Sequence, residues 1–349
     1  MPRTYLPIVP AGALRRLRVH EPLDTRFRSA ARVLQSQWRA DRGLPMGSYT
    51  RPNGDCLRLG SMITEKAGER GSNFLLPEIA RLARREVAYR QPGAFIEERR
   101  LWCNLLSSMP MTLNLLGPLR LNPRLATKML RAMFADLADA TVEAVLFEYS
   151  PGRGSPQLTH DATAFDAAFV YSRPSASRGL IGIETKFSEA LAEPAGPLSP
   201  RFAELAQIAG LHRSPKTDEL TRGPLRQFFR QHLLAQATLM RGDFSEGRFV
   251  VIAPELNTPL QAGIRKYADT LVPPSTEQVG FLSITLERMI DLLGQCGERG
   301  YAAQLFARYC DWSRVDEVIE AEIAAMGQPP FVGNDNVAAE DSPAASAAA

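Results

Sequence analysis

Two neighbouring apolar stretches carry charged residues that a buried strand does not normally accept. The stretch TAFDAAFVYS (163–172) contains Asp166, and GLIGIETKFSE (179–189) contains Glu184 and Lys186. Side chains alternate between the two faces of a strand, so Glu184 and Lys186 point to the same face. Burying a charge is costly unless it is paired or bound to a metal. We therefore expect these three residues to serve a chemical purpose.

A hairpin would bring the two carboxylates together. The segment SRPSASR between the strands favours a turn, and we expect a register that places Asp166 beside Glu184. Alternation also places Phe165 on the face opposite to Asp166, together with Ala167. Two carboxylates this close repel each other unless a divalent cation holds them. Mg²⁺ accepts one or two carboxylates and lowers the pKa of a bound water. Lys186 would either orient this water or stabilise the negative charge that develops when the water attacks the phosphate. Such a site is suited to hydrolysing phosphodiester bonds.

Helical periodicity and short apolar runs predict an α/β protein built around one sheet. Besides the two stretches above, strands are predicted at 143–150, 248–256 and 279–285. Helices are predicted at 25–40, 77–89, 95–109, 123–140, 201–212, 224–241, 258–271 and over most of 285–325.

Five segments together resemble the PD-(D/E)XK nuclease superfamily, and within it a largely uncharacterised bacterial subgroup. They are NLLSSMPMTLNLLGPL (104–119), FEYSPGRG (147–154), TAFDAAF (163–169), IGIETKFSE (181–189) and RQFFRQHLLAQ (226–236). The resemblance covers about residues 95–290. It implies a restriction-endonuclease-like fold, in which helices flank a mixed central sheet with an α-β-β-β-α-β core. It also implies cleavage of nucleic acid, with DNA expected, that depends on Mg²⁺ or alternatively Mn²⁺.

The resemblance assigns roles by matching position. Asp166 and Glu184 become metal ligands, and Lys186 completes the catalytic triad. Many family members carry a further metal-binding Glu on the first core helix; Glu98 is the candidate, and Glu148 on the first strand is its competitor. Many also carry a Gln on the helix after the Lys strand, and Gln227 fits that catalytic position, with Arg230 and Gln231 one turn further on. The proline that names the motif is absent, because Phe165 precedes Asp166.

Composition and charge suggest three regions. Residues 1–90 read as a basic, helical or irregular extension, 91–325 as the nuclease-like domain with a helical C-terminal part, and 326–349 as a disordered tail rich in Pro, Ala and Ser. The formal charge is +3, but arginine is concentrated in the first hundred residues, which suits a polyanionic partner.

The remaining sequence features concern the location of the protein, its oligomeric state and the competing functional hypothesis. The four cysteines are far apart, no apolar run is long enough to cross a membrane and no secretory signal is apparent, so we expect a cytoplasmic protein. A homodimer is left open. The competing hypothesis is a nuclease fold without activity that binds nucleic acid or a protein partner.

Overall fold

The computed structural model describes residues 4–50, 54–174, 177–189, 191, 196–273 and 275–327. The predicted tail, 326–349, lies outside these ranges except for its first two residues, which belong to the last helix. Residues 175–176 of the predicted hairpin connection also lie outside them.

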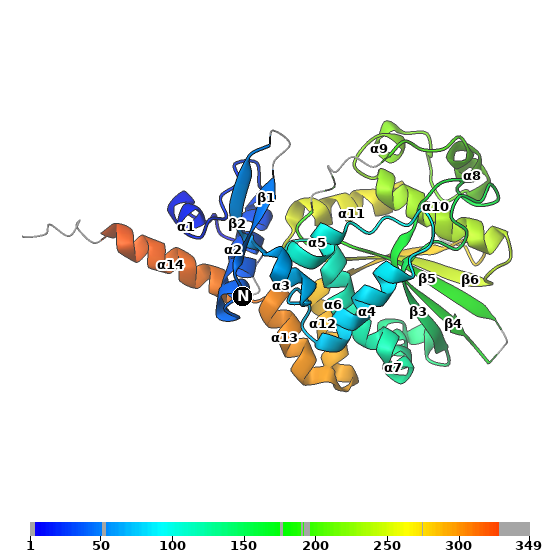
Figure 1. Ribbon diagram of the computed structural model, residues 1–349. Helices are drawn as coiled ribbons and strands as arrows, with labels where there is room; N and C mark the ends of the chain where they lie inside the picture. Colours follow the sequence, from blue (N-terminus) through cyan, green and yellow to red (C-terminus); the bar gives the residue numbers. More distant parts are fainter. Residues whose placement is uncertain are drawn as a thin grey trace, which may run out of the picture.

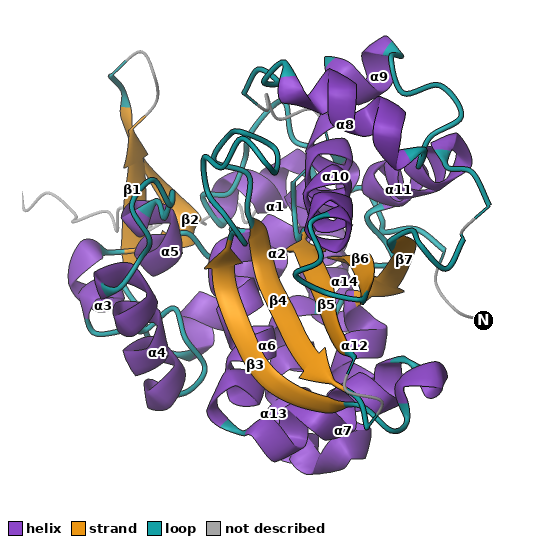
Figure 2. Cartoon of the chain, turned by 90° about the vertical axis from the view of Figure 1, so that its right-hand side faces the viewer, coloured by secondary structure: helices purple, strands orange, loops and turns teal. Residues whose placement is uncertain are grey.

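A five-stranded mixed sheet forms the centre of the molecule (Figure 2). In spatial order its strands are β3 (Thr141–Tyr149), β4 (Phe165–Ser172), β5 (Arg178–Thr185), β6 (Glu246–Ala253) and β7 (Gly280–Thr285). The pairs β3–β4 and β4–β5 are antiparallel, whereas β5–β6 and β6–β7 are parallel. The central strands are almost entirely buried, which explains why their sequences are continuously apolar. All five predicted strands are confirmed.

Helices cover both faces of the sheet (Figures 1 and 2). One face is covered by α6 (Ser108–Leu121), α7 (Pro123–Met133), α12 (Leu286–Leu293) and α13 (Arg299–Tyr309). The other face is covered by α8 (Arg201–Ala209), α10 (Arg226–Met240) and α11 (Thr258–Thr270), with the short α9 (Asp218–Thr221) beside α10. The predicted α-β-β-β-α-β core is confirmed, with α10 as the helix that packs on β5 and β6.

The helix predicted at 95–109 is in fact two helices. The first, α5 (Glu98–Cys103), ends where Asn104 adopts an extended backbone and its Oδ1 accepts a hydrogen bond from the Leu106 N–H. The second, α6, begins after Ser107, whose Oγ caps it by accepting from the Met109 N–H. Because the chain turns here, Glu98 does not share a helix face with the residues of α6. The prediction at 123–140 was likewise too long: α7 ends at Met133, and a 3-10 turn, η1 (Ala135–Leu137), follows.

In the N-terminal region, the described residues 4–50 and 54–103 form five helices and a hairpin. Its elements are α1 (Ala11–Arg16), α2 (Arg26–Asp41), β1 (Met46–Thr50), β2 (Cys56–Ile63), α3 (Glu65–Glu69), α4 (Pro77–Ala88) and α5. The antiparallel β1–β2 hairpin was not predicted, although the sequence between its strands contains Asn53-Gly54, a dipeptide typical of hairpin turns.

The helix α2 packs into the same apolar cluster as one face of the sheet. Its Phe27 ring lies edge-on to Phe187, just beyond β5, and to Trp312 near the C-terminal end. The N-terminal region therefore shares a core with the sheet, and the proposed division at residue 90 stays a prediction.

The C-terminal helices return to the N-terminal region. A π-helical turn, η2 (Gly294–Glu298), links α12 to α13, and α14 (Ser313–Gly327) then packs against α1 and α2 (Figure 1). Arg16 of α1 forms an ion pair with Glu322 of α14. No helix within the described ranges has both the length and the apolar character required to span a bilayer.

Candidate active site

The pairing of β4 with β5 ends just before the charged residues. The last paired residues are Ala167 and Ile183. Beyond them, Asp166 Oδ2 accepts hydrogen bonds from the Thr185 backbone N–H at 2.8 Å and from Thr185 Oγ1 at 2.9 Å. Thr185 Oγ1 also contacts Thr112 Oγ1 of α6. The Asp166 carboxylate thus accepts a backbone hydrogen bond at the end of the β4–β5 pairing, and this bond holds it where the two strands separate.

The side-chain alternation predicted for β4 is interrupted at its first residue. Phe165 packs on the α10 side of the sheet with Ala168, whereas Ala167 packs on the α6 side. The prediction that Phe165 lies on the face of Ala167 was therefore wrong. The Phe165 ring covers Gly182 so closely that a Cβ added at Gly182 would lie 2.4 Å from it. Glycine at this position leaves room for the ring.

The Glu184 carboxylate is buried in a network formed with α10. Its Oε1 accepts from Gln227 Nε2 at 2.6 Å and lies 2.8 Å from Lys186 Nζ. Lys186 Nζ also donates to Gln227 Oε1 at 2.7 Å, so these three side chains form a closed triangle. Glu184 Oε2 accepts from Gln231 Nε2, which also donates to the Ala164 carbonyl. Gln227 and Gln231 lie one helical turn apart, so one face of α10 orients both carboxylate oxygens.

Carboxylates around Lys186 determine its charge. Burial by itself would lower the pKa of the Lys186 ammonium, but Glu184 and two further carboxylates nearby outweigh this effect and raise that pKa above its usual value. Lys186 therefore stays protonated at neutral pH. Burial raises the pKa of Asp166 well above its usual range, and the Glu184 carboxylate raises it further, although Lys186 and the Thr185 donors oppose both effects.

A third buried acid, Glu189, was not predicted as a site residue. Its carboxylate accepts from the Phe187 N–H at 2.8 Å and from the Ser108 N–H, at the start of α6, at 3.0 Å. Burial would raise the pKa of Glu189, but the Lys186 ammonium and these backbone donors lower it below its usual value, so it stays ionised. Glu189 lies in the same segment as Glu184 and Lys186, but beyond the end of β5, where alternation no longer indicates direction.

The two candidates for an additional acidic ligand lie in different places. Glu148, near the end of β3, lines the same cavity as Glu184, and its Oε1 is 3.5 Å from Arg153 Nη2. Its backbone has φ +46°, in the left-handed region that a non-glycine residue rarely adopts. Glu98 does not line this cavity. Its side chain is 53% exposed, and Oε1 accepts from Arg90 Nη1 at 3.1 Å.

These side chains surround one cavity of about 380 Å³. Its chemically active lining residues are Glu148, Asp166, Glu184, Lys186, Glu189 and Gln227. Arg230 also lines it, but the guanidinium is occupied by Asp161 and by Thr163 Oγ1, which fixes the loop that leads into β4. The structure therefore brings Asp166, Glu184, Lys186 and Gln227 together and leaves Glu98 apart.

The donor set of this cavity fits a hard divalent cation. Within the described parts of the chain, no group of three or more His, Cys, Asp or Glu side chains is already arranged to hold a metal ion. Mg²⁺ and Mn²⁺ do not require three protein ligands, because an ion bound by one or two carboxylates completes its coordination with water and substrate oxygens. Asp166 Oδ1 accepts no hydrogen bond from the described residues, and carboxylates outnumber the cationic groups of the cavity. Asp166 and Glu184 are the residues that would hold such an ion.

Comparison with known proteins agrees with this chemistry. A family model described as the PD-(D/E)XK nuclease superfamily matches residues 22–311, which include all the residues of the cavity. The match begins at residue 22, just before α2, whereas the sequence resemblance covers only about residues 95–290. Searches of curated proteins and of solved structures found no match.

Proposed function

The chain belongs to the PD-(D/E)XK nuclease superfamily, and we propose that it hydrolyses phosphodiester bonds in nucleic acid, with DNA as substrate and Mg²⁺ or Mn²⁺ as the required ion. One observation carries this proposal: Asp166, Glu184, Lys186 and Gln227 converge in a single cavity at the end of two adjacent strands. Family membership supports hydrolysis in general, whereas the substrate and the residue roles are our inference.

The roles of the side chains follow from their contacts. When bound by Asp166 and Glu184, the ion acts as a Lewis acid on the phosphate and lowers the pKa of a water. Lys186 is cationic, so it stabilises the negative charge that grows on the phosphate oxygens and does not act as a base. Gln227 fixes the distance between Lys186 and Glu184 by bonding to both. Water oxygen bonds to phosphorus, the bond to one ester oxygen breaks, and the leaving oxygen takes up a proton.

The arginines near the cavity are suited to binding the nucleic-acid backbone. Arg100 lines the cavity, and Arg81, Arg84 and Arg85 are exposed on α4. Contacts of this kind bind phosphates without reading the base sequence. They weaken as the salt concentration rises, because the release of counterions from the nucleic acid then becomes less favourable. Binding of substrate should therefore fall steeply between low and physiological salt.

Cleavage assays with an Asp166→Asn variant test the proposed function. Supercoiled plasmid, single-stranded DNA and RNA are incubated with the protein in Mg²⁺, in Mn²⁺ and in EDTA. We expect cleavage of DNA in either metal and none in EDTA, and a rate about 10³-fold lower for Asp166→Asn because it loses a charged ligand. Asp139→Asn, at an exposed acid outside the cavity, is the matched control.

Two outcomes would contradict this function. Equal cleavage by the wild type and by Asp166→Asn would place the active site elsewhere. DNA binding without cleavage in any metal would support the alternative of an inactive nuclease fold that acts as a binding module.

Metal binding should depend on pH because Asp166 has a raised pKa. The protonated carboxyl is a poor ligand, so ion binding must release the proton, and the affinity should rise with pH through the raised pKa and level off above it. Titration calorimetry with Mg²⁺ at one pH, in two buffers of different ionisation enthalpy, measures the released protons. Asp166→Asn should release none. Identical heats in both buffers for the wild type would count against this assignment.

A further inference from the structure

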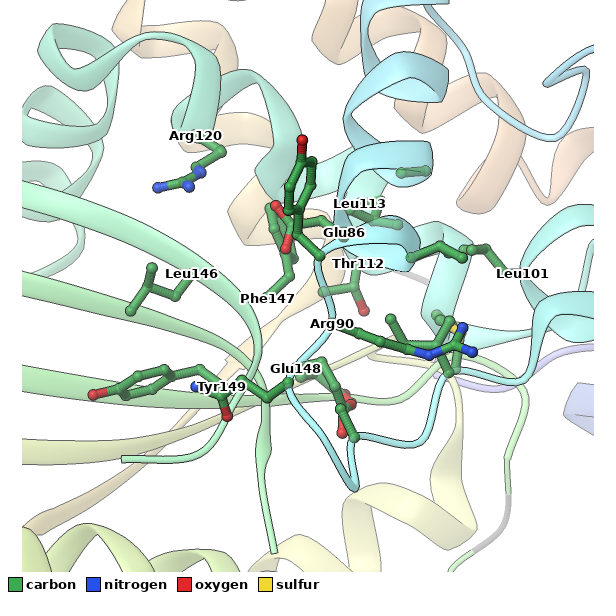
Figure 3. Close-up of a pocket in the computed structure, with 18 residues that line it drawn as sticks. Glu86, Arg90, Leu101, Thr112, Leu113, Arg120, Leu146, Phe147, Glu148 and Tyr149 are labelled. Carbon is green, nitrogen blue, oxygen red and sulfur yellow. The ribbon is translucent and has the colours of Figure 1, made fainter. Parts of the chain in front are cut away.

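A second cavity lies directly beside the candidate active site. It encloses about 210 Å³ between α4, α6 and the end of β3 (Figure 3). The two cavities share three lining residues, Met109, Glu148 and Asp166. A group that enters the second cavity therefore lies beside Glu148 and Asp166, which line both cavities.

The wall of this second cavity is mostly apolar, and its charged residues are Glu86, Arg90 and Arg120 besides the shared Glu148 and Asp166. Leu113, Leu146 and Phe147 contribute apolar surface, and Figure 3 shows Glu86 and Arg120 extending into the same space above Leu146 and Phe147. Within the described residues, neither Glu86 nor Arg120 forms a hydrogen bond or an ion pair. Burial raises the pKa of Glu86, and Arg120 and Arg85 oppose this effect. A carboxylate and a guanidinium are thus free to bind a ligand over an apolar floor.

The size of this cavity limits its occupant. Sites for drug-sized ligands have volumes of about 300–1,000 Å³, so 210 Å³ suits a single planar ring system rather than a whole nucleotide. A nucleobase is such a group, and its faces pack well on apolar and aromatic side chains. Its sugar and phosphate would remain outside, toward Glu148 and Asp166.

We propose that this cavity binds the base of the nucleotide next to the scissile phosphodiester, and that Glu86 and Arg120 select guanine. The proposal rests on the proposed nuclease function. Guanine presents acceptors at O6 and N7, which an arginine binds in a bidentate manner. Its N1–H and N2–H₂ groups are donors, which a carboxylate accepts. The base must be unpaired to enter, so a single-stranded or locally opened substrate is preferred.

Binding to short oligonucleotides tests this proposal without requiring cleavage. The probes are fluorescent 15-nucleotide strands of thymidine in which the central base is dG, dA, dC or dT, and anisotropy is measured in EDTA. A good bidentate contact discriminates between bases by about 10- to 100-fold, so we expect the dG strand to bind at least about 10-fold more tightly. A preference for any other base, or none, would overturn the proposal.

Variants connect the preference to this cavity. Glu86→Gln and Arg120→Leu should reduce the preference for dG to within about threefold. The controls are Glu69→Gln on α3 and Arg124→Leu on α7, which remove the same charges from exposed positions outside the cavity and should keep the preference. Loss of preference in the controls, or its retention in both cavity variants, would reject the roles of Glu86 and Arg120.

Cleavage mapping separates this proposal from the nuclease function. A random single-stranded DNA library is cut in Mg²⁺, and the ends are sequenced. Guanine should be enriched at one nucleotide flanking the cut by the wild type, and this enrichment should disappear in Glu86→Gln. Cutting without enrichment contradicts the base site alone, whereas selective binding without any cutting contradicts the nuclease function alone.

Discussion

Replacing Lys186 with methionine is expected to stop DNA cleavage and, at the same time, to strengthen Mg²⁺ binding. The ammonium contacts Glu184 Oε1 at 2.8 Å, so it competes with a cation for one of the two ligands. Without it, the carboxylates of Glu184, Asp166 and Glu189 lose their shared counter-charge and attract a divalent ion more strongly. Cleavage should nevertheless fall by about 10³-fold, because the Lys186 ammonium no longer stabilises the developing phosphate charge.

Calorimetry and thermal unfolding measure the two effects separately. The melting temperature of Lys186→Met should be below that of the wild type in EDTA, because buried like charges repel, and should rise more steeply with Mg²⁺. Lys128→Met, at an exposed lysine of α7, is the matched control and should change none of these quantities. A variant that cleaves normally, or that binds Mg²⁺ more weakly than the wild type, would contradict the role given to Lys186.

Local sequence rules paired Glu184 with Lys186 and Gln227 with Gln231, and the family resemblance linked Gln227 to the first pair. Period-two alternation predicted that Glu184 and Lys186 share a face, and the structure places both side chains against Gln227. Helical spacing predicted that Gln231 follows Gln227 along one face of α10, and both bond to Glu184. Alternation holds as far as Lys186, although β5 ends at Thr185, because the Lys186 N–H still donates to the Ile252 carbonyl of β6 at 2.8 Å. Gln227 and Gln231 both lie within the regular helix α10.

Irregular backbone is where the same rules failed. Helical periodicity placed Glu98 on an inward face, but Asn104 ends the helix and the next one begins in another direction. Alternation gave no direction for Glu189, which follows the end of β5, and it misplaced Phe165 at the start of β4. The left-handed backbone of Glu148 depends on tertiary context, because no local rule favours it for glutamate.

The N-terminal region illustrates a different reason for failure. The strands of its β1–β2 hairpin lie in a stretch that mixes Pro, Gly and Arg, a composition that favours an irregular segment, although the last five residues of β2 are all buried. Its helix α2 was predicted from amphipathicity, but the partner of its apolar face was not. That partner includes Phe187 and Trp312, which are distant in sequence, so the shared core follows from tertiary packing alone.

Glu148→Gly is expected to give a more stable protein than Glu148→Gln, and both variants are expected to be less active than the wild type. The left-handed backbone at position 148 costs a non-glycine residue about 1–2 kcal/mol, which glycine avoids. Glycine loses about 0.5–1 kcal/mol through its greater unfolded-state entropy. The free energy of unfolding of Glu148→Gly should therefore exceed that of Glu148→Gln by about 1 kcal/mol, as measured by urea denaturation. Both variants remove the carboxylate and its ion pair with Arg153, so they differ only in the backbone freedom of residue 148 and in the side chain that glutamine keeps.

The cleavage rates of these variants decide which acid supports the metal site. Glu148 lines the cavity, and its carboxylate acts on Glu184 electrostatically, so both Glu148 variants should cleave about 10- to 100-fold more slowly. Glu98→Gln should stay within about twofold of the wild type, because that carboxylate is exposed and paired with Arg90. A loss of activity in Glu98→Gln as large as in Glu148→Gln would identify Glu98 as an acidic residue that supports the metal site. A Glu148→Gly variant that is no more stable than Glu148→Gln would instead show that the strain at position 148 does not exceed the roughly 0.5–1 kcal/mol that glycine loses through unfolded-state entropy.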